Sequence, residues 1–156
     1  MFSLNTSPGT YALILGADFP TVIEVGRFGT LCVEPGFYVY TGSALGPGGL
    51  RGRVARHCRE EKKLRWHIDY LRVVTQVLEV WCTAGAARQE CRWGESLASM
   101  RGATVPAHGF GSSDCACRSH LFRFRGRPSL RAFRRRLALP TDIFVYHQHL
   151  EIFRCD

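Results

Sequence analysis

The first third of the chain consists of short apolar stretches separated by turns rich in glycine, proline and acidic residues. Residues 10–15 form an apolar run between two glycines, with the length of a buried β-strand. Further strands are predicted at residues 21–25, 30–33 and 37–40. Because the connecting turns are short, we expect these strands to pair with their chain neighbours in an antiparallel meander.

The rest of the chain alternates between helical and strand-like patterns. Residues 50–61 place apolar side chains on one stripe at helical spacing, as do residues 86–100. The pattern also predicts a short helix at residues 65–71 and strands at residues 77–82 and 121–124. This order of elements indicates the α+β class, with a small, mainly antiparallel sheet flanked by helices.

The chain has 156 residues, which is enough for one domain with a hydrophobic core. We assign that domain to residues 1–125 and residues 126–156 to a basic C-terminal extension. The extension contains a predicted helix at residues 129–137 and an apolar, strand-like stretch at residues 141–153. A DNA-contacting arm, a packed extension and a decoration of the domain all remain open for this segment.

Composition excludes several classes of protein. Hydrophobic residues make up 46% and aromatic residues 12% of the chain, which argues against disorder. No apolar run approaches the ~20 residues of a membrane span, and the first residues do not resemble a signal peptide. The seven cysteines are an odd number without a secretory context. We therefore expect a cytoplasmic protein, independent of membranes, with free and mostly buried thiols.

The formal charge is +8, and it is unevenly placed along the chain. Residues 51–65 have a net charge of +5, from seven basic and two acidic side chains, and residues 118–136 hold eight arginines without an acid. Clustered positive charge attracts a phosphate backbone, although a solvated basic surface has the same composition. We expect DNA as the partner. The predicted backbone contacts are Arg51, Arg56, Arg59, Lys62, Lys63 and Arg118.

The residues with distinctive chemistry gather at one strand-loop-helix junction. Tyr38 and Tyr40 alternate onto one face of a strand, where each buried phenol needs a hydrogen-bond partner. The glycine-proline loop at residues 45–49 lacks side chains that would hinder a close backbone approach. Arg53 and His57 then share one face of the next helix, at i and i+4. Tyrosine, arginine and histidine in this arrangement suit phosphate chemistry better than packing alone.

The same stretch carries a resemblance to a known family. Tyr40-Thr41-Gly42, followed by Arg53-x-x-x-His57 and preceded by Gly9-Thr10-Tyr11, resembles the GIY-YIG nuclease superfamily. The match is closest to its stand-alone, poorly characterised microbial branch, which carries versions of YVYTGSALGPGGL, RWHIDYL and GFGSSDCxCRSHL. The resemblance covers roughly residues 8 to 124. It implies a single α+β nuclease domain that hydrolyses phosphodiester bonds.

The resemblance also implies a role for each motif residue. Tyr11 matches the tyrosine that helps to deprotonate the attacking water, and Tyr40 matches the one that positions the water or the scissile phosphate. Gly42 is the glycine that lets the backbone pass close by. Arg53 matches the arginine that neutralises the phosphate, and His57 takes the place of an additional base or proton relay.

Glu90 matches the metal-binding glutamate of the superfamily. Its helical register places it near the buried side of the helix, where a carboxylate needs a partner. The implied partner is one Mg²⁺ or Mn²⁺ ion, which can take phosphate and water as its remaining ligands. An ion pair between Glu90 and an arginine is the alternative. Glu95 is a competing acid without the family spacing.

Three further polar residues around this centre are assigned a catalytic or a structural role. His67 is either a base- or phosphate-orienting residue or a structural histidine between apolar neighbours. Asp69 lies in the same short helix, and Ser43 follows the motif glycine. We assign Asp69 and Ser43 to the structural part of the motif.

A second dense motif spans residues 108–122 and contains Cys115-x-Cys117-x-x-His120. These three residues are potential soft metal ligands, with His108 as a potential fourth. Zinc sites usually use two to four residues between paired cysteines, so the single intervening residue argues against structural zinc. We expect Ser113 and Asp114 to form a hydrogen-bonded turn that braces the active site.

The sequence thus favours a divalent-metal-dependent DNA endonuclease, in repair or other DNA processing. The alternative is a non-catalytic nucleic-acid-binding module on the same fold. A third reading, a redox or metal-binding protein built on Cys115, Cys117 and His120, is the weakest. We expect no organic cofactor. Specific cutting would require a homodimer or recruitment by a partner protein, because the chain shows no separate targeting domain.

Overall fold

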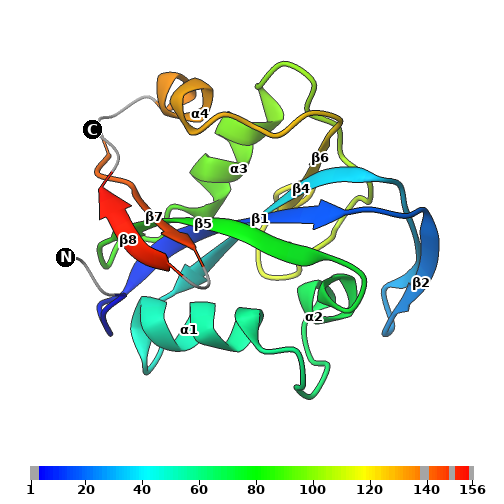
Figure 1. Ribbon diagram of the computed structural model, residues 1–156, viewed down its shortest axis with the longest axis horizontal. Coiled ribbons are helices and arrows are strands. Elements are labelled where there is room, and N and C mark those ends of the chain that lie inside the picture. The colour runs from blue at the N-terminus through cyan, green and yellow to red at the C-terminus, as the bar shows by residue number, and fades with distance from the viewer. Residues whose placement is uncertain (1–3, 138–140, 148–149, 155–156) are drawn as a thin grey trace.

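The computed structural model describes residues 4–137, 141–147 and 150–154 and has the α+β architecture expected from the sequence (Figure 1). Its main sheet has six antiparallel strands in the order β6-β4-β1-β5-β7-β8. The strands are β1 (Gly9–Ala17), β4 (Gly36–Ala44), β5 (Gln76–Ala84), β6 (Leu121–Phe124), β7 (Phe144–His147) and β8 (Leu150–Arg154).

Helices cover both faces of this sheet (Figure 1). On one face lie α1 (Gly49–Cys58) and α2 (His67–Arg72), and on the other lie α3 (Glu90–Ala98) and α4 (Leu130–Arg136). Strand β1 is buried on both sides because its side chains alternate between two cores. Leu13 joins the core that contains α1 and α2, whereas Ile14 joins the core that contains α3 and α4.

The expected meander is wrong. Within the described residues, strands β2 (Thr21–Val25) and β3 (Gly29–Val33) pair only with each other, as a separate two-stranded sheet. Helix α2 packs against β2. Strand β1 instead pairs with β4, with Tyr11 opposite Gly42. The physical reason is the apolar character of β1 on both faces, which requires a central position between two long partners. The motif residues of β1 and β4 are therefore direct neighbours.

The C-terminal segment packs into the same molecule as the rest of the chain. Phe133 of α4 is fully buried, with its ring stacked on Trp81 of β5 and edge-on to Trp93 of α3. Strand β7 extends the main sheet through pairs such as Val145 with Trp81. Of the three readings of this segment, the packed extension therefore describes residues 126–136 and 143–147. None of the described helices combines the length and apolar character needed to cross a membrane.

Candidate active site and metal centre

A pocket of about 310 Å³ brings together residues from β1, β4, all of the first three helices and the loop between α3 and β6. Its walls include Tyr11, Tyr40, Arg53 and Glu90, which the resemblance placed at one catalytic centre. The other lining residues are Gly42, Ser43, Leu45, Gly46, Arg65, Trp66, His67, Arg88, Gly111, Ser113, Asp114, Cys115 and His120.

Tyr11 and His57 form a hydrogen-bonded pair behind this pocket. The Tyr11 hydroxyl lies 2.7 Å from His57 Nε2, and both side chains are almost completely buried. Burial is the main reason that the pKa of Tyr11 is well above its usual value, and nearby Tyr40 adds to the effect. Burial also lowers the pKa of His57 to about 3, helped by the positive charge of Lys62. At neutral pH, Tyr11 is therefore a phenol and His57 a neutral imidazole.

Two glycines make room for the two motif tyrosines. A Cβ atom at Gly42 would lie 2.4 Å from the Tyr11 hydroxyl oxygen, because the two residues are opposite each other in the β1–β4 pair. At Gly111, a Cβ atom would lie 2.7 Å from the Tyr40 ring. Burial raises the pKa of Tyr40, as does the negative charge of Glu90. The Tyr11 hydroxyl can occupy its position because Gly42, the motif glycine, has no Cβ atom.

Arg53 enters the pocket from α1 with its guanidinium 4.5 Å from the centre of the Trp66 ring. The second guanidinium near that ring belongs to Arg56, at 3.9 Å, and it forms two hydrogen bonds of 2.8 Å to Asp69. Within the described residues, Arg53 forms no ion pair with an acidic side chain. Trp66 therefore supports a cation whose charge is available to a ligand in the pocket.

Asp69 organises the segment that carries Trp66. Its carboxylate is fully buried and also accepts hydrogen bonds from the backbone N–H groups of Arg65 and Trp66. Burial alone would raise the pKa of Asp69. The hydrogen bonds from Arg56 and from the two backbone N–H groups outweigh burial and lower that pKa to about 2. The structural assignment of Asp69 fits these contacts.

Glu90 is the first residue of α3, and its side chain is 14% exposed at the pocket wall. Its nearest cationic partner is Arg88, with a nitrogen–oxygen distance of 3.5 Å. The predicted Mg²⁺ or Mn²⁺ site can be compared with the donor atoms present. In the described part of the chain, Glu90 belongs to no group of three or more ligating side chains. One carboxylate beside an arginine is a poor fit to a resident cation, and we derive no catalytic step through one.

His67 has a defined contact that supports its interpretation as a structural histidine. The backbone N–H of Gly111 donates to His67 Nδ1 at 2.9 Å. The ring also packs against Phe28 and Phe110, with centroid distances of 4.9 and 5.4 Å. Burial lowers the pKa of His67, which keeps Nδ1 available as an acceptor. His67 thereby holds the turn at Gly111 against α2, and it also lines the pocket.

The predicted DNA contacts divide into exposed and engaged side chains. Arg51, Arg59 and Lys63 are exposed, and exposed Arg118 lies 3.3 Å from His108. Arg56 and Lys62 each have an intramolecular role. Arg56 pairs with Asp69, and the Lys62 ammonium donates to three backbone carbonyls at the end of α1, those of residues 56, 57 and 59.

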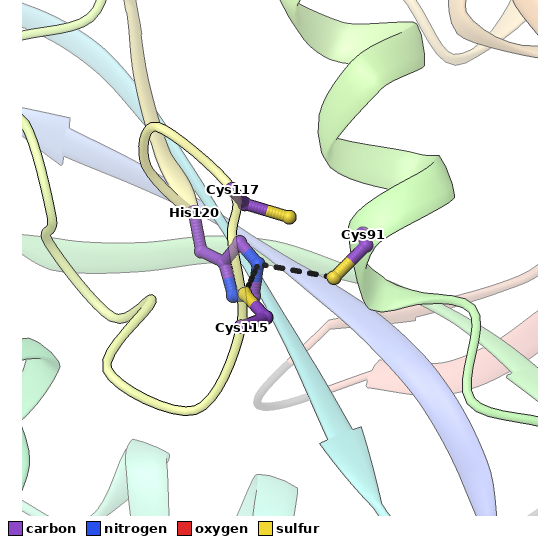
Figure 2. Close-up of side chains that lie close together, drawn as sticks. All are labelled: Cys91, Cys115, Cys117 and His120. Carbon is purple, nitrogen blue, oxygen red and sulfur yellow. Dashed lines mark hydrogen bonds between the residues drawn. The ribbon is translucent and has the colours of Figure 1, made fainter.

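The sequence argument against structural zinc, which rested on the spacing of Cys115 and Cys117, is wrong. Cys91, Cys115, Cys117 and His120 converge so that their ligand atoms all lie within 4.8 Å of one another (Figure 2). The fourth ligand is Cys91 of α3, whereas His108 contacts Arg118 instead. The spacing rule failed because it considered only the 115–120 motif, and the fold supplies the missing thiol from a distant helix.

Several pocket residues were not identified from the sequence. Arg65, Trp66 and Arg88 line the pocket, and Cys91 completes the thiol cluster. Arg65 and Trp66 lie in a motif that the resemblance already highlighted, so that motif was the available signal. Cys91 directly follows Glu90, but no local pattern links it to residues 115–120.

Residues 10–139 match the model of a family described as a domain of unknown function, DUF123. No curated protein and no solved structure gives a significant match to the chain. The matched region begins on β1 and extends past α4, so it includes the pocket, the thiol cluster and helix α4. The family region thus continues beyond residue 124, where the motif resemblance ended.

Proposed function

We propose that this chain, which belongs to the DUF123 family of unknown function, is a DNA endonuclease that hydrolyses phosphodiester bonds. One observation carries the proposal. Tyr11, Tyr40, Arg53 and Glu90 come from four different elements and line one pocket of about 310 Å³. Packing alone does not require a cation, a carboxylate and two phenols on the same wall.

Arg53 is the proposed site of the scissile phosphate. Its guanidinium lacks an acidic partner among the described residues and is supported by the Trp66 ring. A planar, permanently charged guanidinium can form paired hydrogen bonds with two phosphate oxygens. In a partly enclosed pocket, this interaction stabilises the negative charge that accumulates on the phosphorus substituents during in-line attack.

Tyr11 and His57 supply the proposed path for the proton of the attacking water. The raised pKa of Tyr11 makes it a protonated phenol, so it cannot act alone as a phenolate base. As the water oxygen attacks phosphorus, its proton passes to the Tyr11 hydroxyl oxygen, and the Tyr11 proton passes to His57 Nε2. The bond from phosphorus to the sugar oxygen opposite the water breaks, and the departing oxygen takes a proton from solvent at the open side of the pocket. The negative phosphate bound at Arg53 raises the pKa of His57 and favours this transfer.

Tyr40 and Glu90 complete the proposed centre. Tyr40 faces the pocket and can hydrogen-bond to the water or to a phosphate oxygen. The Glu90 carboxylate can accept a hydrogen bond from the same water and orient it for attack. A surface that only binds DNA has no use for a carboxylate beside the phosphate, because its charge repels the backbone. Glu90 therefore favours hydrolysis over a non-catalytic binding module.

The proposed substrate is DNA, and its backbone would contact the exposed cations of α1 and the segment after it. Arg51, Arg59 and Lys63 are exposed there, and the whole chain has a net charge of +8. We place the protein in the cytoplasm, because reduced thiols such as those of Cys91 and Cys115 persist there. The proposed process is DNA repair or other DNA processing. Specific cutting would require a homodimer or a recruiting partner.

The test is nicking of supercoiled and branched DNA, with and without added magnesium, by matched pairs of variants. Glu90→Gln is compared with Glu95→Gln, because Glu95 is exposed on the same helix. Tyr11→Phe is compared with Tyr38→Phe, because Tyr38 does not line the pocket and its hydroxyl is hydrogen-bonded to the Glu34 backbone. We expect the two pocket variants to lose at least about a hundredfold in rate and the two control variants to change little.

Two outcomes would overturn the proposal. Cleavage that survives both Glu90→Gln and Tyr11→Phe would show that another site or a contaminant cuts the DNA. Tight, salt-sensitive DNA binding without any cleavage by the wild-type protein would assign the chain to the binding module.

A further inference from the structure

We propose that Cys91, Cys115, Cys117 and His120 bind one zinc ion in a closed tetrahedral site that joins α3 to the loop before β6. The four side chains point toward a common centre, Cys91 from α3 and the other three from the loop (Figure 2). This site is separate from the proposed hydrolytic reaction, and its existence does not depend on that reaction.

Two of the distances between the ligand atoms match those of a tetrahedral zinc site, and the others lie within 4.8 Å. Zinc–sulfur and zinc–nitrogen bonds of ~2.3 and ~2.05 Å place neighbouring sulfur and nitrogen atoms ~3.6 Å apart and two sulfurs ~3.8 Å apart. The Sγ atoms of Cys115 and Cys91 lie 3.4 and 3.7 Å from His120 Nε2. All pairs among the four ligand atoms lie within 4.8 Å. An ion at the centre would therefore require only small movements of the side chains.

The donor set selects zinc among common metal ions. Three thiolates and one imidazole are soft or borderline ligands, which zinc accepts and which magnesium and calcium do not. Four protein ligands leave no position for a water molecule, so the site is structural in type and does not activate a nucleophile.

The loop that carries three of the ligands is already closed at its base. Two backbone hydrogen bonds, from Gly109 N–H to the Arg118 carbonyl and from His120 N–H to the Phe110 carbonyl, are 2.6 and 2.8 Å long. Phe110 is fully buried and anchors the same base. Between these points, residues 112–119 contain turns and bends but neither helix nor strand. The proposed zinc ion supplies a further crosslink, which holds the tip of the loop in place.

The ion would hold together two segments that contribute to the pocket wall. Cys91 follows Glu90, and Cys115 follows Asp114, so each side of the ion adjoins a carboxylate of the pocket wall. Cys115 and His120 themselves line the pocket. The zinc ion therefore fixes the position of the start of α3 relative to the loop.

The experiment measures metal content and coordination directly. Purified full-length protein is analysed by inductively coupled plasma and native mass spectrometry, and a second sample is prepared in zinc-poor medium with cobalt. We expect about one zinc per chain, and for the cobalt form the intense visible absorption of tetrahedral Co²⁺ with thiolate charge-transfer bands in the near ultraviolet. Cys117→Ser should bind much less zinc and lose about a third of the charge-transfer intensity from any cobalt it retains, since one of three thiolates is removed.

Cys32→Ser is the matched control, because Cys32 is exposed on β3, outside the cluster. Its zinc content and cobalt spectrum should equal those of the wild-type protein. Circular dichroism confirms that each variant is folded, and the wild-type spectra stand even if Cys117→Ser does not fold. Folded wild-type protein without zinc and without a tetrahedral cobalt spectrum would overturn the proposal. So would a disulfide between two of the three cluster cysteines in freshly purified protein.

Discussion

The two polar clusters around the pocket are built in opposite ways. The first wall contains Tyr11, which lines the pocket, together with His57, Arg56 and Asp69, which lie outside its lining. This cluster satisfies most of its polar groups internally, through a 2.7 Å hydrogen bond and a bidentate ion pair. The four-ligand cluster, Cys91 with Cys115, Cys117 and His120, brings together three thiols and an imidazole that form only weak hydrogen bonds with one another. The first region is held mainly by contacts between protein groups, whereas the second offers a set of donor atoms that the proposed zinc ion would satisfy.

This difference indicates which part of the pocket is stable on its own. The tyrosine–histidine wall rests on the central strands and on α1 and α2, whose side chains form a continuous core. The other wall rests on a loop of turns and on the first turn of α3. We therefore expect metal loss to loosen the second wall and to leave the first intact. The following predictions test this contrast.

At neutral pH, metal removal should have the largest effect. Zinc that binds only the folded state at about 1,000 times its Kd stabilises that state by about 4 kcal/mol. For a chain of this size, chelation should lower Tm by roughly 8–16 °C. Thermal unfolding with and without chelator measures the shift. The Cys32→Ser variant should show the same shift, and a wild-type Tm that chelator leaves unchanged would remove the contrast between the walls.

Acid should weaken the first wall through His57. Its folded-state pKa of about 3 lies below the ordinary value of 6.5, so the unfolded chain binds the proton first. The stabilisation is complete above pH 6.5 and is lost as the pH falls toward 3, by about 1.4 kcal/mol per pH unit. Denaturant unfolding of wild type and His57→Gln over this range checks the prediction. The variant should have the shallower pH slope, and equal slopes would contradict the assigned burial effect.

Asp69→Asn should cost about 3 kcal/mol of unfolding free energy, because it leaves the partly buried Arg56 without its carboxylate. The exposed Asp18→Asn is the matched control and should stay within about 0.5 kcal/mol of wild type. Urea unfolding at neutral pH gives both values. Equal effects of the two substitutions would show that the ion pair is not important for this wall.

Gly42→Ala should have the smallest of these effects, about 1–3 kcal/mol, from overpacking against the Tyr11 hydroxyl. Gly126→Ala is the control, since no atom lies within 4 Å of the added Cβ at that site. Unfolding free energies of the two variants provide the comparison. A neutral Gly42→Ala would mean that Tyr11 moves easily, which the central position of β1 does not allow.

The fold could largely be predicted from the sequence because local patterns are strong here. The strand predicted at residues 21–25 matches β2, and Tyr38 and Tyr40 share one face as alternation requires. Pairing could not be predicted from short turns, because the β2–β3 hairpin stands apart and β1 reaches β4 across it. Period-two alternation specifies a strand and its faces, whereas the choice of partner depends on the whole core.

The candidate site was predicted only where the residues lie in recognisable motifs. The fourth metal ligand, Cys91, lies on a helix far from the 115–120 motif along the chain, and only the packing of α3 beside that loop reveals it. Charge alone also could not separate Arg51, which is exposed, from Lys62, which caps the end of α1. Such distinctions depend on tertiary contacts.

The most direct test of the proposed function is the single-turnover nicking rate of Arg53→Ala against Arg51→Ala. Both substitutions remove one arginine from α1, but only Arg53 lines the pocket, over the Trp66 ring. We expect a loss of about a thousandfold for Arg53→Ala, from lost stabilisation of the transition-state charge. For Arg51→Ala, weaker DNA binding should be overcome at saturating protein. Equal rates for the two variants would contradict the assignment of the pocket as a phosphodiesterase centre.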